Sequence, residues 1–376
     1  MKRENGVKLA LLFIIIATVI SALTVFTVSA ERSEVSAKSA ALYEPSSKRF
    51  LYSKNTDVRL PMASTTKIMT ALVAAESVPL DGIVSIPAAA VGTEGSSAYF
   101  KEGEQLTVKA LLYAVLLQSA NDASVALAHY VSGSTEGFAL KMNERAKSLG
   151  LHDTNFVNPH GLHDEEHYTT AHDLAIITAA ALENETVRDI AATQKATVES
   201  DLSRRVFLNH NKLLNIYDGC IGVKTGFTKS AGRCLVGAAE RDGVRLISVT
   251  LSAPNDWRDH ERLLDLGFSM TENRLLAKKG DFEYTLPALG SGGKSVTASL
   301  SEDVRRVLLK SDGQVTADVR LSRYLAAPLS EGQRVGEVVF TLDGKEIARE
   351  TLTVKEAVKE EKKIGILWKI KNFFCK

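Results

Sequence analysis

Hydrophobic and polar positions divide this 376-residue chain into two parts that follow different periods. In the first part, stretches with apolar side chains at helical spacing stand between short strand-like runs. We predict helices at 65–75, 107–118, 121–131, 135–149, after the N-cap sequence 169–173 and at 258–269, a β-hairpin of 39–43 and 49–53, and strands from 222 through 235–236 to 246–251. This order of elements predicts a mixed α/β domain of roughly 240 residues, here 31–273.

The second part alternates polar and apolar residues and shows no helical period. Asp312-Gly313 and Asp343-Gly344 stand between alternating runs, and such dipeptides favour hairpin turns. The predicted strands are 283–286, 295–300, 304–310, 315–321, 335–342 and 345–354. Residues 274–355 are therefore predicted to form a small all-β domain, a spacer rather than a catalytic unit, because few chemical groups converge in it.

The N-terminus combines a basic start with a long apolar run. Lys2, Arg3 and Lys8 precede an almost unbroken apolar stretch, 9–28, and small residues end at Ala30. This pattern is typical of a secretory signal, residues 1–30, that is cleaved after Ala30. The apolar run is also long enough to span a bilayer uncleaved, and both outcomes place the rest of the chain outside the cytoplasm.

The last residues, 356–376, form a basic segment with the spacing of an amphipathic helix. Five apolar residues between Ile366 and Phe374 share one sector of the helix, while Lys369 and Lys376 occupy the opposite sector. Such a helix suits the surface of an anionic bilayer. We expect the exported protein to lie on the outer face of the cytoplasmic membrane; docking of this helix on the protein itself is the alternative.

Composition narrows the function classes without choosing one. A net charge of +1 argues against a nucleic-acid partner, because nucleic-acid binders carry a concentrated basic excess. Three cysteines are too few for a disulfide scaffold in an exported chain of this length. Cys220 and Cys234 are predicted to lie on adjacent strands but offset by several positions, so two buried thiols are expected rather than a disulfide.

Three short motifs carry the candidate chemistry, and the first is Ser64-Thr65-Thr66-Lys67. Ser64 and Lys67 are three residues apart at a helix start, so their side chains share one face. A serine hydroxyl needs a neighbour to take its proton, and Lys67 can do so when burial or a nearby cation such as Lys224 lowers its pKa. Alone, the pattern is common and also fits a serine near a helix start with an exposed lysine one turn later.

The other two motifs supply the remaining groups for acyl transfer. Ser119-Ala120-Asn121 can be a simple helix boundary, but it also offers a hydroxyl that relays protons and a carboxamide that holds a substrate amide. Lys224-Thr225-Gly226 lies on a predicted strand, where the lysine and threonine can bind a carboxylate and the glycine lets a peptide approach closely. The backbone N–H of Phe227 can join that of Ser64 as an oxyanion hole.

This combination is typical of penicillin-binding proteins and class A β-lactamases. The chain resembles the low-molecular-mass penicillin-binding proteins, specifically the D-alanyl-D-alanine carboxypeptidases, over nearly its whole length. The resemblance is carried by residues 60–70 (LPMASTTKIMT), 119–124 (SANDAS), 158–162 (NPHGL) and 218–228 (DGCIGVKTGFT). It implies an α/β (α+β) catalytic domain of the β-lactamase/transpeptidase-like kind, a second, small all-β domain and a C-terminal amphipathic helix.

The resemblance also implies a role for each matched residue. Ser64 would form the acyl-enzyme, Lys67 would take its proton, and Ser119 would pass that proton toward the leaving D-alanine. The residues implied to bind substrate are Asn121, Lys224, Thr225, Gly226, Phe227 and Arg258. Some relatives carry histidine where this chain has Phe227, so the backbone donor is kept while any side-chain contribution differs. The implied partners are peptidoglycan stem peptides and β-lactam antibiotics, without a cofactor.

Three other functions compete with this interpretation. A class A β-lactamase would need Ser-Asp-Asn at the second motif and a Glu-x-x-Leu-Asn segment for deacylation; Ala120 and the missing segment argue against it. A D,D-endopeptidase or transpeptidase on the same scaffold stays open, because the motifs do not say whether water or an amine accepts the acyl group. An inactive β-lactam sensor is disfavoured by the intact Lys67 and Ser119.

Four histidines near Asp164 invite the hypothesis of a metal site; they are His160, His163, His167 and His172. Two histidines four residues apart on one helix face would be needed, and the 163–167 pair straddles a charged loop instead. We predict a polar loop before a helix and no metal.

Overall fold

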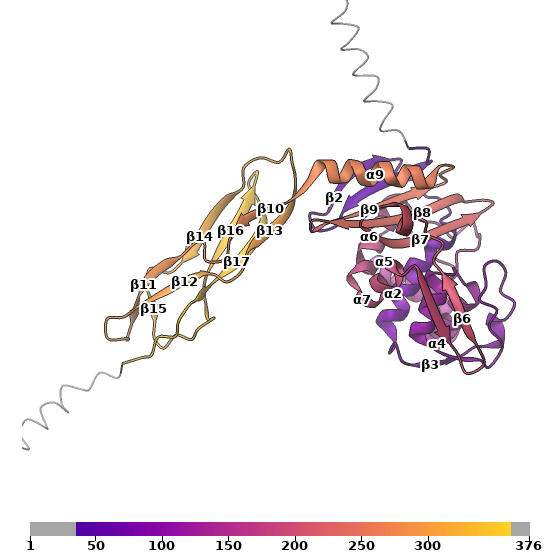
Figure 1. Cartoon of the computed structure of the whole chain (residues 1–376), viewed down its shortest axis with the longest axis horizontal. Coiled ribbons are helices and arrows are strands. Elements are labelled where there is room, and N and C mark those ends of the chain that lie inside the picture. The colour runs from indigo at the N-terminus through magenta and orange to yellow at the C-terminus, as the bar shows by residue number, and fades with distance from the viewer. Residues whose placement is uncertain (1–34, 362–376) are drawn as a thin grey trace, which may run out of the picture. The chain divides into compact units, whose positions relative to one another are not determined.

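The computed structural model describes residues 35–361, which form two compact units (Figure 1). The first unit holds the described residues up to Arg241 together with Arg245–Gly267, and the second holds Asp242–Val244 and the residues from Phe268 onward. The predicted signal, 1–30, and most of the predicted helix 356–376 lie outside the described residues. Within 35–361, no helix is long and apolar enough to cross a membrane.

A five-stranded sheet forms the centre of the first unit. Its strand order is β2-β1-β9-β8-β7, and its strands are β1 (Ser39–Glu44), β2 (Arg49–Lys54), β7 (Cys220–Thr228), β8 (Gly232–Arg241) and β9 (Val244–Leu251). The predicted hairpin of 39–43 and 49–53 is confirmed, with Ala41 opposite Ser53. Because β7 is the last strand in this order, one of its two edges has no neighbouring strand in the sheet.

Helices cover both faces of this sheet (Figure 1). One face carries α9 (Asp256–Met270), and the other carries a block of η1 (Ala63–Thr66), α2 (Lys67–Ser77), α3 (Val108–Leu116), α4 (Asn121–Ser132), α5 (Thr135–Ser148), α6 (Ala171–Glu183) and α7 (Glu185–Ala192). All six predicted helices are confirmed to within a few residues, including the N-cap at Thr170, whose side chain accepts from the Asp173 N–H.

The elements of the first unit that the sequence pattern missed are too short to show a period. They are α7, α8 (Leu213–Ile216), η2 (Ala88–Ala90), the pair β3 (Ile83–Ser85) and β4 (Gln105–Thr107), and the pair β5 (Lys195–Glu199) and β6 (Arg204–Leu208).

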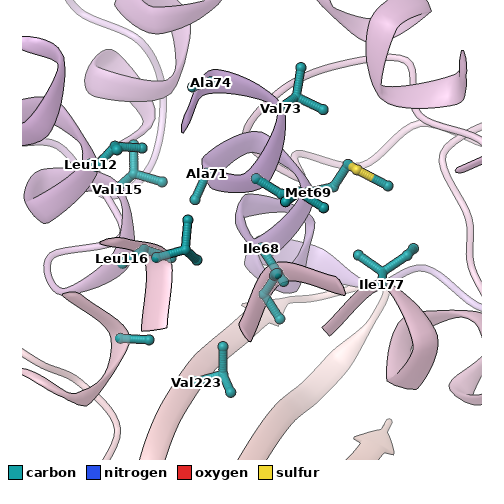
Figure 2. Close-up of a cluster of buried hydrophobic side chains, with 14 of the residues drawn as sticks. Ile68, Met69, Ala71, Val73, Ala74, Leu112, Val115, Leu116, Ile177 and Val223 are labelled. Carbon is teal, nitrogen blue, oxygen red and sulfur yellow. The ribbon is translucent and has the colours of Figure 1, made fainter. Parts of the chain in front are cut away.

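The helix that begins at Lys67 is buried along most of its length. Residues 67–74 of α2 are all buried, and Figure 2 shows Ile68 and Met69 of this helix among apolar side chains that include Leu116 of α3 and Ile177 of α6. A helix that is apolar on every side belongs to the core of its domain. The core therefore fixes the position of the lysine in the first turn of α2.

A buried histidine holds α9 on the sheet. The His260 ring is fully buried, with its Nδ1 2.7 Å from the Ser248 hydroxyl and its Nε2 2.9 Å from the Thr250 hydroxyl. Burial lowers the pKa of His260 to about 3, from an ordinary value of 6.5. The ring is therefore neutral in the folded protein at neutral pH.

We predict that acid destabilises the fold through His260. Between pH 6.5 and about 3, the unfolded chain binds a proton on this histidine that the folded chain does not bind. Stability therefore falls as the pH falls, by up to about 1.4 kcal/mol per pH unit for one histidine. The free energy of unfolding, measured by urea titration from about pH 7 down to about pH 5, should fall less steeply in His260→Gln than in the wild-type protein. Equal slopes would contradict this prediction.

The second unit is built from β-strands. A six-stranded sheet has the order β14-β16-β17-β12-β11-β15, and β10 pairs with β13. The strands are β10 (Thr271–Ala277), β11 (Tyr284–Leu289), β12 (Ser295–Leu300), β13 (Val304–Leu309), β14 (Thr316–Leu321), β15 (Leu325–Ala326), β16 (Arg334–Leu342) and β17 (Lys345–Val354). The prediction of a C-terminal all-β domain is confirmed.

Of the two predicted hairpin turns in this unit, one is right and one is wrong. Asp343 and Gly344 both have positive φ and join β16 to its antiparallel partner β17. Asp312-Gly313 does not join paired strands, because β13 pairs with β10 and β14 pairs with β16. A hairpin at Asp312-Gly313 would need β13 to pair with β14, but β13 pairs with β10, a strand that the sequence pattern missed. The Asp312 carboxylate accepts the Leu309 N–H at the end of β13.

Candidate active site

The first motif lies where η1 continues into α2. Ser64 belongs to η1 and Lys67 is the first residue of α2, and the Lys67 Nζ lies 3.0 Å from the Ser64 Oγ. Ala63, directly before Ser64, has a φ of 49°, in the left-handed region that costs a residue with a Cβ roughly 1–2 kcal/mol. The packing around η1 therefore presents Ser64 on a strained turn, as is common at functional sites.

Lys67 is fully buried and has three hydrogen-bond partners. Its Nζ lies 3.0 Å from the Ser64 Oγ, 2.6 Å from the Asn121 Oδ1 and 2.7 Å from the His160 carbonyl oxygen. Burial and, second, the charge of Lys224 hold the pKa of Lys67 well below its ordinary value of 10.5, against a smaller opposing effect of Asp122. The site therefore favours the neutral amine.

These partners suit a neutral amine that acts as a base. Such an amine has two N–H groups to donate and one lone pair to accept with. The Asn121 Oδ1 and the His160 carbonyl can only accept, so they take the two N–H groups. The lone pair is then left for the Ser64 hydroxyl, which donates to it. This is the arrangement in which a serine can lose its proton as its oxygen attacks a carbonyl.

The His160 carbonyl reaches Lys67 because the segment 158–161 crosses the start of α2 at very short range. The Pro159 carbonyl, one residue earlier, accepts from the Thr70 Oγ1 at 2.6 Å. Gly161 has a φ of 89°, and a Cβ at this position would lie only 2.0 Å from the Ala63 carbonyl oxygen. Only glycine, which has no Cβ, allows this approach.

The second motif places its serine and its asparagine differently. Ser119 lines the same cleft as Ser64 and lies in the turn before α4, with a φ of 61°. Asn121 is buried, its Oδ1 bonded to Lys67 and its Nδ2 donating to the Glu94 carbonyl at 2.5 Å. In the described contacts Asn121 therefore orients Lys67 and is not among the residues that line the cleft.

The third motif lies on β7, next to the nucleophile. Lys224 is buried, and burial lowers its pKa to about 7; its Nζ donates to the Thr225 carbonyl at 2.9 Å. Thr225, Gly226 and the exposed Phe227 line the cleft. A Cβ on Gly226 would lie 3.0 Å from the Ser64 backbone nitrogen, so the glycine allows β7 to approach η1 closely.

One cleft of about 390 Å³ is lined by five of the predicted residues and by six that the sequence analysis missed. The five are Ser64, Ser119, Thr225, Gly226 and Phe227. The six are Ser96, His210, Lys212, Arg233, Asp256 and Trp257. The arginine stands on β8 directly opposite Phe227, and its Nη2 donates to both carboxylate oxygens of Asp256, at 2.9 and 2.8 Å. No spacing in the sequence marks this pair, because a strand and a helix start bring it together only in the folded chain.

The structure does not bring Arg258 to this cleft, which corrects the prediction that it lies near the substrate. Arg258 lines a separate cavity, together with Lys54 and Arg262 among others. It follows Asp256 by two positions on α9, which is about 200° around a helix. Because Asp256 faces the catalytic cleft, Arg258 faces away from it. The arginine that lines the catalytic cleft is Arg233.

The remaining candidate groups have partners within the fold. The His172 Nδ1 lies 3.0 Å from the Asp173 Oδ1, and no group of three or more His, Cys, Asp or Glu residues in the described part of the chain is arranged to hold a metal ion. Cys220 stands opposite Ala239 and Cys234 opposite Gly226, so the two thiols are offset along the strands. Both are free; Cys234 is buried as predicted, whereas Cys220 is only partly buried.

Two serines that line one cleft, a buried lysine beside the first of them and a second buried lysine on the adjoining strand β7 define an enzyme that transfers acyl groups through a serine ester. Comparisons with known proteins agree with this class. Residues 24–255 match the peptidase S11 family, D-alanyl-D-alanine carboxypeptidase, and residues 272–360 match the C-terminal domain of penicillin-binding protein 5. The chain is also 34% identical over 337 residues to the D-alanyl-D-alanine carboxypeptidase DacF of Bacillus subtilis, covering 86% of each chain.

Solved structures of other proteins resemble this one, and two of them show the extent of the likeness. Penicillin-binding protein 5 from Haemophilus influenzae superposes with a TM-score of 0.64 and 32% identity, covering 87% of this chain and 98% of the other. The S96A mutant of the DD-transpeptidase of Streptomyces K15 superposes with a TM-score of 0.61 and 33% identity, covering 63% of this chain and 99% of the other. The chain therefore belongs to the D-alanyl-D-alanine carboxypeptidase family, and it is a serine-type carboxypeptidase and a penicillin-binding protein.

Proposed function

We propose that this enzyme removes the terminal D-alanine from the pentapeptide stems of peptidoglycan through an acyl-enzyme on Ser64. The observation that carries the proposal is the buried Lys67 amine, whose two acceptor partners leave its lone pair for the Ser64 hydroxyl. A β-lactam would acylate Ser64 by the same attack.

In the first half of the proposed reaction, the Ser64 Oγ attacks the carbonyl carbon of the D-Ala-D-Ala bond while Lys67 takes its proton. The N–H groups of Ser64 and Phe227 stabilise the negative oxygen that forms, and the short distance from Gly226 to the Ser64 nitrogen supports this pairing. Ser119 passes the proton to the nitrogen of the leaving D-alanine. In the second half, water attacks the ester and gives a proton to Lys67, and Ser64 regains its hydrogen.

The cleft also accounts for substrate binding. The free edge of β7 can pair with an extended peptide as an additional strand. Lys224 and Thr225 would hold the terminal carboxylate, and Arg233, anchored on Asp256, lines the cleft and adds a further positive charge. Asn121 would act through Lys67, because its carboxamide is already bonded at both ends.

Incubation of the protein with a peptide that ends in D-Ala-D-Ala should release free D-alanine, and benzylpenicillin should add its mass to a peptide that contains Ser64. The Ser64→Ala variant should do neither, although it should unfold at the same temperature as the wild type. An inert wild-type protein, or equal release by the variant, would contradict the proposed function.

Transfer to an amine is the second candidate, and the similarity to a DD-transpeptidase favours testing it. Glycine added to the same assay would compete with water for the acyl-enzyme. We expect free D-alanine to form with little of the glycine adduct; a dominant adduct would reassign the enzyme as a transpeptidase.

We further propose that the chain is exported after cleavage at Ala30, that 31–273 and 274–355 are its two domains, and that 356–376 holds it on the outer face of the cytoplasmic membrane. The support is the charge and apolar pattern at both ends of the sequence. The signal-cleaved protein should sediment with membranes, and the same protein ending at residue 355 should stay in the supernatant. A shortened protein that still sediments would contradict the role of the tail.

A further inference from the structure

His167 is a buried histidine that contacts Thr66, two residues after the nucleophile, and the proposed reaction does not use it. Its side chain is almost inaccessible to solvent, and the ring packs edge-on against Phe156, with 5.8 Å between ring centroids. It lies between the start of α2 and the segment 157–161, the segment that supplies the His160 carbonyl to Lys67.

The hydrogen bonds of His167 determine which nitrogen carries its proton. The Val157 N–H donates to the Nδ1 at 3.1 Å, so Nδ1 must be the acceptor. A neutral imidazole with an acceptor at Nδ1 has its hydrogen on Nε2, and the Nε2 lies 2.8 Å from the Thr66 Oγ1. The Thr66 hydroxyl in turn donates to the Ala63 carbonyl at 2.8 Å. All donors in this chain therefore point one way, from Val157 to Ala63.

This chain of hydrogen bonds connects the segment 157–161 with η1, the two parts of the chain that contact the candidate base Lys67 and its serine. At one end, Val157 begins the segment that places the His160 carbonyl 2.7 Å from the Lys67 Nζ. At the other end, Ala63 directly precedes Ser64. Between them the segment also touches η1 at Gly161, which packs on the Ala63 carbonyl. His167 thus bridges the segment and η1.

We propose that His167 is a positioning residue for acylation. It holds the 157–161 segment against η1, so that the His160 carbonyl shields the Lys67 amine from water and orients its lone pair toward Ser64. The proposal rests on the roles proposed above for Ser64 and Lys67. Without this bridge, water would reach Lys67 and stabilise its charged form. The pKa of Lys67 would then rise toward its ordinary value.

The charged and titratable groups around the two residues are few. The charges that affect the pKa of Lys67 are those of Lys224 on β7 and Asp122 on α4. His167 interacts electrostatically with Asp164 and His163 of its own loop, and with Lys67 and His160. Burial lowers the pKa of His167 to about 4, so the ring stays neutral at neutral pH and keeps its acceptor for the Val157 N–H.

Two substitutions separate positioning from simple packing. In His167→Gln, the amide can still accept from the Val157 N–H and donate to the Thr66 hydroxyl, whereas His167→Leu keeps much of the volume and loses both bonds. The measurement is the rate of acylation by benzylpenicillin from acid to alkaline pH, with the unfolding temperature of each variant. We expect His167→Gln to stay near the wild-type rate. We expect His167→Leu to lose a factor of about 100, with the acid limb of its pH profile moved to higher pH.

If His167→Leu does not fold, Thr66→Val gives the same test. It removes the hydroxyl that accepts from the Nε2–H and donates to the Ala63 carbonyl, so it breaks the same bridge and should move the acid limb in the same direction. A folded His167→Leu or Thr66→Val variant with the wild-type rate and acid limb would overturn the proposal, as would a Gln variant as slow as the Leu variant. These outcomes are distinct from failure of the proposed function, in which the wild-type protein itself would not be acylated.

Discussion

Replacing Lys67 with methionine should nearly abolish acylation of Ser64 by both D-Ala-D-Ala peptides and β-lactams. Methionine fills a similar buried volume without a charge, so the fold around α2 should be kept. Loss of a general base costs roughly a factor of 10²–10⁴, and more where nucleophile and base act as one unit. We expect the rate constant for acylation by a fluorescent penicillin to fall about a thousandfold or more.

The pH profile identifies the base in the same experiment. In the wild-type protein, acid protonates Lys67 and acylation slows as the pH falls, because the charged amine has no lone pair for the serine proton. The residual rate of Lys67→Met should lack this acid limb. Lys195→Met, which changes an exposed lysine on β5, is the matched control and should behave as the wild type. An acid limb that survives in Lys67→Met would assign the base to another group.

Replacing Gly161 with alanine should cost both activity and stability. The new Cβ would overlap the Ala63 carbonyl, whose oxygen and carbon would lie 2.0 and 2.5 Å away, so the 158–161 segment or η1 must move. Either movement separates the His160 carbonyl from Lys67. A displacement of about 1 Å can cost a factor of about 100 in rate, and forced overpacking costs about 3 kcal/mol of stability.

Gly150→Ala is the control for this prediction. Gly150 has a φ of 78°, close to the 89° of Gly161, but no atom lies within 4 Å of its would-be Cβ. It should lose only about 1 kcal/mol from backbone strain and keep the wild-type rate of acylation. Urea unfolding and penicillin acylation of both variants test the comparison. Equal losses at the two glycines would show that backbone strain, and not the contact with Ala63, is responsible.

Periodicity and local motifs predicted most of the fold. Long helices such as α5 and α6 could be predicted from the spacing of their apolar residues and from their capping residues. The strands β16 and β17 could be predicted from the alternation of polar and apolar residues on either side of Asp343-Gly344. Short elements such as α8 do not span enough residues to show a period. Partner choice is also not local: the sequence of Asp312-Gly313 favours a hairpin, yet β13 pairs with β10, a strand that the sequence pattern missed.

The candidate site was predictable only where the side chain itself is the reagent. The residue types and motifs of Ser64, Lys67 and Ser119 indicate a nucleophile, a base and a proton relay. The His160 contribution comes from a backbone carbonyl, which every residue has, so nothing in the sequence marks it. Arg258 was proposed only from its resemblance in position to a family arginine, and the structure places Arg233 of β8 in the cleft instead.

The two buried lysines imply a thermodynamic link between substrate binding and proton affinity. The charge of Lys224 lowers the pKa of Lys67. A carboxylate that binds Lys224 would cancel part of this repulsion, so Lys67 would become a stronger base when the peptide has arrived. Linkage is reciprocal, so protonation of Lys67 would tighten the binding of a carboxylate ligand by the same factor. Under the proposed roles, free D-alanine as product should therefore bind more tightly as the pH falls, and the empty site would hold a weaker base than the occupied one.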